Sequence, residues 1–199
     1  MEHDFLPDEW QQFYADCVNC RACSLGELRQ NAVVSRGALN APLFILGEGP
    51  GEKEDLQGRP FVGRSGHLLD TLLQAIDLPL DQVHIGNIVK CRPPGNRVPT
   101  EAEATSCEPL LTRQFDLVKP KIVLLMGATA YKYFTGQSDP ITKIRGMWQR
   151  HRGMDVMPTF HPAYVLRNNR HRLPLYDDLL AVKKRLESTL LEEKNHEQV

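Results

Sequence analysis

Residues Pro42–Gly66 read PLFILGEGPGEKEDLQGRPFVGRSG, and this stretch decides the fold that we expect. The apolar run Leu43–Leu46 predicts a buried strand that stops at Gly47, where glycine, proline and carboxylates take over. A helical pattern starts after Ser65, so a strand, a loop of about eighteen residues and a helix follow one another. Loops of this length are usually functional, and the carboxyl end of a parallel strand is where α/β proteins place a site.

The rest of the chain alternates strand patterns with helix patterns. We expect helices over Pro7–Asp16, Ser65–Leu78, Thr100–Val118, Gly127–Phe134 and Leu175–Leu191, and strands over Val83–Val89 and Ile122–Met126. Ile144–Arg150 and Asp155–Phe160 form either a hairpin or two separate sheet strands. The alternation predicts a three-layer α/β/α fold with a central, mostly parallel four-stranded sheet. The loops after Leu46, Val89 and Phe160 would then lie together at one edge.

Length and composition are those of a globular protein with one domain. The chain has 199 residues, 41% hydrophobic and 25% charged, with a net charge of −1, so no overall field attracts nucleic acid. No apolar run approaches the ~20 residues of a membrane span, and the acidic start has no signal-peptide core. We therefore expect a cytoplasmic protein without a membrane partner.

Positive charge gathers in one part of the chain. Residues 143–172 contain seven Lys or Arg and one acid, a local balance of +6. Such a run indicates either a solvated face or an anion-binding face. Independent signals are needed to decide between the two.

Five cysteines in a chain without a secretion signal indicate metal ligands more than disulfides. Cys20 and Cys23 form a C-x2-C pair, and Cys91 and Cys107 are separated by fifteen residues. Four such thiolates would hold either zinc or an iron–sulfur cluster, and the spacing does not decide between them. Cys17 offers a second C-x2-C register, and buried free thiols are the alternative interpretation.

Several polar or aromatic residues follow the predicted strands. The GEGPG loop, Gly47–Gly51, is neither a P-loop nor a G-x-G-x-x-G motif, and Glu48 stands at its mouth. Asn87 interrupts an apolar strand, and its amide is either a structural hydrogen bonder or a group that reads a pyrimidine edge. Phe61 is either a core residue or a stacking platform. His161, at a strand end, would face Asn87 and the glycine loop.

Together these motifs resemble the uracil-DNA glycosylase superfamily, specifically family 4, the iron–sulfur members of bacteria and archaea. The matching motifs are CRACSLGELR, GEGPGEKEDLQGRPFVGRSGHLLD, NIVKCRPPGNRVPT, the Cys91–Cys107 spacing and HPAYVLR, which extend from Cys20 to about Arg167. The resemblance implies a single glycosylase-like domain over residues 1–199. It also implies a monomeric hydrolase that flips uracil out of single- or double-stranded DNA and leaves an abasic site.

The resemblance assigns four cysteines to a [4Fe–4S] cluster: Cys20, Cys23, Cys91 and Cys107. Cys23 is preferred to Cys17 because Leu25 and Arg29 follow it at the spacing of the family pattern. A relative that links covalently to DNA has an inserted basic loop with a histidine after the second strand. This chain reads CRPPGNRVPT there, so ordinary hydrolysis is expected.

The resemblance also assigns roles around the base. Glu48 and Gly49 would hold and orient the hydrolytic water, although other superfamily members place an aspartate at the position of Gly49. Phe61 would stack on uracil, Asn87 would read its edge and His161 would bond to its O2. A further carboxylate would close the side where thymine carries a methyl group; this residue is Glu54.

DNA would be held through its phosphates by cationic side chains from the basic loops. The candidates are Arg92, Arg97, Lys143, Arg145, Arg167 and Arg170. Leu166 would act as a wedge in the vacated base stack. Two other hypotheses stay open: a non-enzymatic metal-containing nucleic-acid-binding module, and a nucleotide-binding α/β enzyme that uses the glycine loop.

Overall fold

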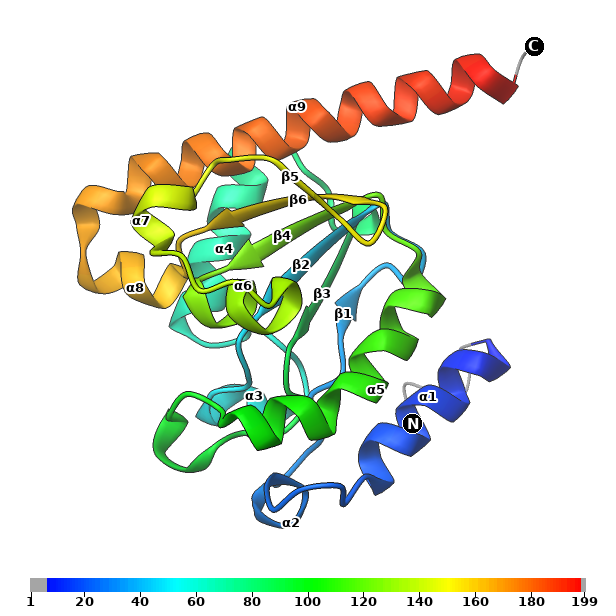
Figure 1. Ribbon diagram of the computed structural model, residues 1–199, viewed down its shortest axis with the longest axis vertical. Coiled ribbons are helices and arrows are strands. Elements are labelled where there is room, and N and C mark those ends of the chain that lie inside the picture. Colours follow the sequence, from blue (N-terminus) through cyan, green and yellow to red (C-terminus); the bar gives the residue numbers. More distant parts are fainter. Residues whose placement is uncertain (1–6, 198–199) are drawn as a thin grey trace.

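The computed structural model describes residues 7–197, which fold around one mixed sheet (Figure 1). The helices are α1 (Asp8–Asn19), α2 (Leu25–Leu28), α3 (Glu52–Gln57), α4 (Arg64–Ala75), α5 (Glu101–Val118), α6 (Ala128–Thr135), α7 (Ile141–Ile144), α8 (Pro162–Arg167) and α9 (Arg172–Glu197). The strands are β1 (Arg36–Gly37), β2 (Leu43–Gly47), β3 (Val83–Asn87), β4 (Ile122–Met126), β5 (Gln149–His151) and β6 (Met154–Thr159). Short 3-10 turns are η1 (Leu80–Gln82), η2 (Pro94–Asn96) and η3 (Asn169–His171).

Within residues 7–197 the strands form a six-stranded sheet in the order β1-β3-β2-β4-β6-β5. The four central strands run parallel, and β1 and β5 pair with their neighbours in the antiparallel sense at the two edges. The expected mostly parallel α/β sheet is confirmed, but it has six strands where four were expected. The chain steps from β2 to β3 on one side and later to β4 on the other. Strand order therefore reverses at β2, and a crevice opens at its carboxyl end.

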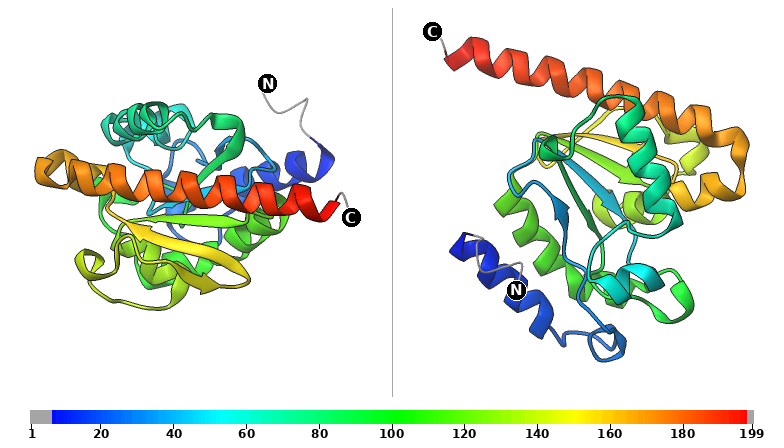
Figure 2. Two further views of the ribbon diagram at one scale, coloured as in Figure 1. Left: turned by 90° about the horizontal axis from the view of Figure 1, so that it is seen from above. Right: turned by 180° about the vertical axis from the view of Figure 1, so that it is seen from behind.

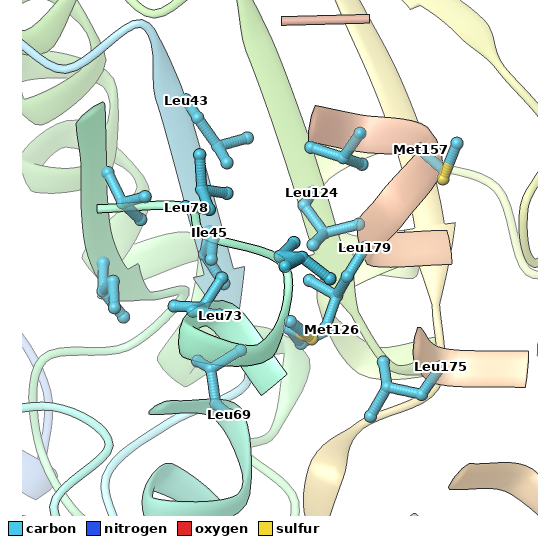
Figure 3. Packing of buried hydrophobic residues seen from close by; sticks show 14 of the residues in the cluster. Leu43, Ile45, Leu69, Leu73, Leu78, Leu124, Met126, Met157, Leu175 and Leu179 are labelled. Atoms are coloured by element: carbon cyan, nitrogen blue, oxygen red, sulfur yellow. The ribbon is translucent and has the colours of Figure 1, made fainter. Parts of the chain in front are cut away.

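Helices cover both faces of the sheet, as a three-layer fold requires (Figure 2). Leu43, Ile45 and Leu124 pack on one face with buried leucines of α4 and α9 (Figure 3). Phe44 and Val123, which are adjacent to these residues along their strands, pack on the other face with α1, α5 and α6. Alternate residues of the central strands are thus buried on opposite sides, which explains their continuous apolar runs.

The elements at the edges of the sheet differ more from the sequence-based expectations than the central strands do. Strand β1 lies at Arg36–Gly37, where no strand was expected. Of the two arrangements left open for this region, the structure has the hairpin: β5 and β6 are joined through Arg152 and Gly153, both at positive φ. Helix α9 continues past Leu191, where fraying was expected, and residues 198–199 lie outside the described part. None of the described helices combines the length and apolarity of a membrane crossing.

The loop after β2 has more structure than the sequence predicted. Helix α3 occupies its middle, and its EKEDLQ sequence has no apolar stripe that would reveal a helix. The next helix starts at Arg64 after Gly63, one residue before the expected start at Ser65. Phe61, which looks exposed between two arginines in the sequence, is 5% exposed. The whole segment is therefore folded against the sheet edge.

Candidate active site and cysteine cluster

A cavity of about 470 Å³ opens at the carboxyl ends of β2, β3 and β6. Its walls come from Glu48–Gly51, Asn87, the segment around Arg97, and His161 with the start of α8. The prediction that the loops after these strands meet at one edge is confirmed. Because the strands run parallel and in register, one cavity collects residues that lie far apart in the sequence.

The ring of Phe61 forms part of the cavity wall. It stacks on His161, with ring centroids 5.8 Å apart and an interplanar angle of 29°. Its backbone has φ of +54°, which turns the side chain inward. A Cβ on Gly47 would lie 2.8 Å from this ring, and one on Gly66 would lie 1.8 Å from the Phe61 carbonyl oxygen. Glycine at these two positions therefore makes room for the ring.

Helix α3 supplies Glu54, whose carboxylate holds the segment that follows Phe61. Its Oε1 accepts hydrogen bonds from the backbone N–H groups of Val62, at 2.9 Å, and Gly63, at 2.7 Å. The residue is 8% exposed and lines the cavity. Glu54 thus fixes the backbone beside the ring, in addition to the methyl-excluding role that the resemblance implies.

His161 precedes Pro162 and caps helix α8. Its Nδ1 accepts a hydrogen bond of 3.1 Å from the backbone N–H of Ala163, so in the neutral ring the proton sits on Nε2. Burial, and then the charge of Arg167, lowers the pKa of His161 to about 4, while Glu54 acts in the opposite direction. The side chain is therefore a neutral N–H donor at physiological pH.

Asn87 is the last residue of β3 and is 2% exposed. Among residues 7–197 no protein group hydrogen-bonds to its side-chain amide, and the residue lines the cavity. A Cβ on Gly47 would lie 2.4 Å from its Oδ1, so the neighbouring strand must present glycine. A buried amide without a protein partner is costly unless a ligand or water satisfies it.

Glu48 and Gly49 form the start of the loop after β2. Glu48 is partly buried and lines the cavity. Its backbone carbonyl accepts a hydrogen bond of 3.3 Å from the Val89 N–H. A Cβ on Gly49 would lie 2.8 Å from Cγ2 of Val89. Any larger residue at Gly49 would have to displace Val89, so the backbone itself borders the cavity here.

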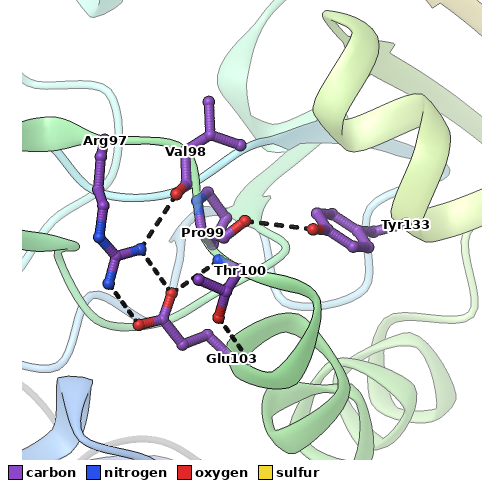
Figure 4. Close-up of polar contacts among 6 residues, drawn as sticks. All are labelled: Arg97, Val98, Pro99, Thr100, Glu103 and Tyr133. Carbon is purple, nitrogen blue, oxygen red and sulfur yellow. Dashed lines mark hydrogen bonds and ion pairs between the residues drawn. The ribbon is translucent and has the colours of Figure 1, made fainter.

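The loop between β3 and α5 is held in place by polar contacts (Figure 4). Arg97 donates to both oxygens of Glu103, at 2.8 and 2.6 Å, and Glu103 also accepts from the Thr100 N–H. Thr100 accepts from the Glu103 N–H, so the two residues form a capping box at the start of α5. The hydrogen bond from Arg97 is the main cause that lowers the pKa of Glu103 to about 2. The Tyr133 hydroxyl donates to the Pro99 carbonyl.

The residues expected to contact DNA occupy different surroundings. Arg97 and Arg167 line the cavity, whereas Arg145 is bound to the buried Asp178 and to the Pro174 carbonyl. Partners were not expected for these arginines, because an ion pair between distant segments leaves no local pattern. The rest are Arg92, bonded to Asn96, exposed Lys143 and Arg170, and partly buried Leu166.

The cysteines of the two predicted ligand pairs line one small pocket. These residues are Cys20, Cys23, Cys91 and Cys107. Arg29 donates a hydrogen bond of 2.9 Å to the Cys91 sulfur. Cys17 is fully buried nearby but is not in the lining of that pocket. In the described part of the chain, no three His, Cys, Asp or Glu side chains converge on a single metal ion.

Lys90 was not singled out from the sequence, yet it lies between this pocket and the cavity. It is 1% exposed, and burial lowers its pKa while the neighbouring cysteine thiolates act in the opposite direction. The signal in the sequence was a lysine directly between an apolar strand and a cysteine.

Comparison with known proteins gives the class of protein first. Residues 34–182 match the family model of the uracil DNA glycosylase superfamily, and the chain belongs to that superfamily. Within it, the chain is similar to the type-4 uracil-DNA glycosylase of Thermotoga maritima, with 46% identity over 77% of this chain and 81% of that protein. The type-4 enzyme of Sulfurisphaera tokodaii is 40% identical over 88% and 84%, and that of Saccharolobus solfataricus is 41% identical over 85% and 82%.

Proposed function

We propose that this protein is a monofunctional uracil-DNA glycosylase that hydrolyses the N-glycosidic bond of uracil in DNA. The observation that carries this function is the meeting, in one cavity, of the Asn87 amide, the Phe61 ring and a neutral His161. Among the described residues that amide has no protein partner, so it is available to the edge of a base. This set supports base recognition over the phosphate binding that a glycine loop alone would suggest.

Uracil must leave the base stack before the cavity can take it. Phe61 supplies a stacking surface, worth roughly 1–3 kcal/mol, and Asn87 offers a donor and an acceptor to the Watson–Crick edge. Glu54, which lines the same cavity, would exclude the methyl group of thymine. The cavity therefore accepts a flat pyrimidine, whose Watson–Crick edge bonds to Asn87 and whose methyl side is restricted by Glu54.

Bond cleavage places negative charge on the departing uracil and positive charge on the sugar. The Nε2–H of His161 is aimed by the hydrogen bond at its Nδ1, and it stabilises the charge that develops on uracil O2. A donor of this kind is worth about 3 kcal/mol of transition-state stabilisation. Glu48 and the backbone of Gly49 orient the water that completes hydrolysis. Strong nucleophilic activation is not needed, because the leaving group is stabilised.

We further propose that Cys20, Cys23, Cys91 and Cys107 hold a [4Fe–4S] cluster. The four thiols line one pocket, as the ligands of one cluster require, and the family resemblance favours iron–sulfur over zinc. When bound, the cluster supplies a rigid cross-link between the segment after α1, the segment after β3 and helix α5. Arg29, which donates to Cys91, offsets part of the thiolate charge.

We infer that the protein acts as a monomer with one domain, on both single- and double-stranded DNA. The partly buried Arg92 and the exposed Lys143, Arg167 and Arg170 hold phosphates, which positions the strand without reading sequence. Leu166, on helix α8 beside the cavity, fills the space that the flipped base leaves. Binding through phosphates makes excision weaken steeply as salt rises.

The test is incubation of the purified protein with an oligonucleotide that contains one uracil, followed by alkali, which cuts the strand at abasic sites. We expect cleavage with the wild-type protein and a rate roughly 100-fold lower for Asn87→Ala. Asn40→Ala, at an exposed turn, is the matched control and should behave like the wild type. Equal rates for Asn87→Ala and the wild type would show that Asn87 does not read the base.

A further inference from the structure

Lys90 is buried between the two sites of the protein. Its Nζ donates a hydrogen bond of 2.8 Å to the backbone carbonyl of Asn87 and a second to Oε1 of Gln114. Both bonds are fully enclosed, and only 1% of the residue is exposed. Lysine is almost never buried this deeply unless it is paired, so a specific role has to account for it.

The orientation of Gln114 is fixed by the groups behind it. His84 Nδ1 lies 2.8 Å from the Ala38 carbonyl and must carry the proton, which leaves Nε2 as an acceptor. Gln114 Nε2 donates to that nitrogen, at 2.9 Å, and to the Val34 carbonyl, at 3.2 Å. Its Oε1 is therefore left to accept from Lys90. Hydrogen bonds therefore link the Lys90 ammonium through Gln114 to His84 on β3 and to the Val34 carbonyl before β1. The direction of each of these bonds is determined.

Lys90 also borders the cysteines. It lines their pocket together with Cys91 and Cys107. Its backbone carbonyl accepts from the Val33 N–H at 2.8 Å, so the backbone is tied down as well. Only two residues separate it from Asn87, which lines the base cavity. One residue thus lines the cysteine pocket and, through its Nζ, holds the strand end that presents Asn87.

We propose that Lys90 is a positioning residue that couples the cysteine centre to uracil recognition. Its ammonium offsets thiolate charge and, through the Asn87 carbonyl, holds the backbone from which the Asn87 amide projects. This inference rests on the proposed function. It means that cysteine ligation and base reading share one fixed hydrogen bond, although the linings of the two pockets have no residue in common.

The test compares Lys90→Met with Arg29→Gln in the protein purified with its cluster. Met keeps much of the buried stem and removes the ammonium, whereas Arg29 contacts Cys91 without contacting Asn87. We expect both variants to shift the midpoint potential of the cluster to more negative values, because each loses a nearby positive charge. Only Lys90→Met should lose kcat/KM for uracil excision, by about tenfold.

The outcomes separate the two proposals. A wild-type protein that releases no uracil would contradict the proposed function. An active wild type, with Lys90→Met unchanged in potential and in kcat/KM, would overturn only the role of Lys90. If Lys90→Met does not fold, Gln114→Met removes one of the two partners of the ammonium and should give a smaller loss of kcat/KM. No loss in that variant, with the Asn87 contact left as the sole hydrogen bond, would also contradict the coupling.

Discussion

At the scale of the residue, the chemistry depends on a histidine that stays neutral. The Nδ1 of His161 caps helix α8, and its Nε2 remains a hydrogen-bond donor in the cavity. Its pKa is lowered from 6.5 to about 4, first by burial and then by the charge of Arg167. Neutral imidazole is therefore the form present from about pH 5 upward. Protonation of Nδ1 would remove the acceptor that starts the helix.

We predict that the single-turnover rate of uracil release is flat between about pH 6 and pH 8 and falls only toward pH 4. A group with the ordinary histidine pKa would give an inflection near 6.5. His161→Ala should lower the plateau roughly 100-fold, because the donor to the uracil oxygen is lost. His67→Ala, at an exposed position of α4, is the matched control. An inflection near 6.5 that disappears in His161→Ala would contradict the neutral donor.

At the scale of the element, α5 and the loop before it form one unit. Glu103 caps the helix and binds Arg97, and its carboxylate is almost fully buried while Arg97 is partly exposed. The folded-state pKa of Glu103 is lowered from 4.5 to about 2. Its contribution to stability is therefore complete above pH 4.5 and is lost as the pH falls toward 2.

We predict that Glu103→Gln lowers the free energy of unfolding by about 1 kcal/mol at pH 7, after allowance for the exposure of Arg97. The difference from the wild type should shrink as the pH falls below 4.5. Urea unfolding at several pH values measures it, and Glu101→Gln, exposed in the same turn, serves as the control. A difference that is constant down to pH 3 would exclude the ionised carboxylate as its source.

Two arginines from the basic segment should respond in opposite ways. Arg145 is bound to Asp178, which is 3% exposed, so Arg145→Gln leaves a buried carboxylate poorly paired and should cost about 3 kcal/mol of stability. Arg167 is exposed at the cavity, so Arg167→Gln should leave the melting temperature unchanged and weaken DNA binding. The slope of log affinity against log salt should fall by about 1. The reverse pattern would contradict these surroundings.

Sequence patterns predicted the central elements because burial on both faces leaves continuous apolar runs. Ile122–Met126 was placed correctly for this reason, and the capping box of α5 was visible in Thr100 and Glu103. The edge strands are two and three residues long, too short for an alternation to register. For Phe61 the sequence left a core position and a stacking platform open, because its positive φ leaves no trace in the neighbouring residues.

The candidate cavity could be predicted as a meeting of loops, since parallel strands end at a common edge. The sequence alone gave Asn87 and His161 as residues of interest, but not their hydrogen bonds. The ion pair of Arg145 with Asp178 and the burial of Lys90 depend on packing between segments far apart in the chain. Such contacts follow from the three-dimensional arrangement, which local patterns do not encode.

At the scale of the whole molecule, the cysteine pocket and the cavity lie on either side of the segment that leaves β3. We predict that purified wild-type protein contains about four irons per chain, as expected for one [4Fe–4S] cluster. Cys107→Ser should lose most of the iron, and its DNA affinity should fall because the loop before α5 is no longer cross-linked. Cys17→Ser should retain the iron. Iron retained in Cys107→Ser but lost in Cys17→Ser would reassign the ligands.

The central claim is that the cavity removes uracil, and not thymine, from DNA by hydrolysis. The most direct measurement is chromatographic detection of the free base released from two matched oligonucleotides that differ only in one uracil or one thymine. The account predicts one equivalent of free uracil, no thymine, and a DNA strand that stays intact until alkali is added. Absence of free uracil, or release of both bases at similar rates, would contradict it.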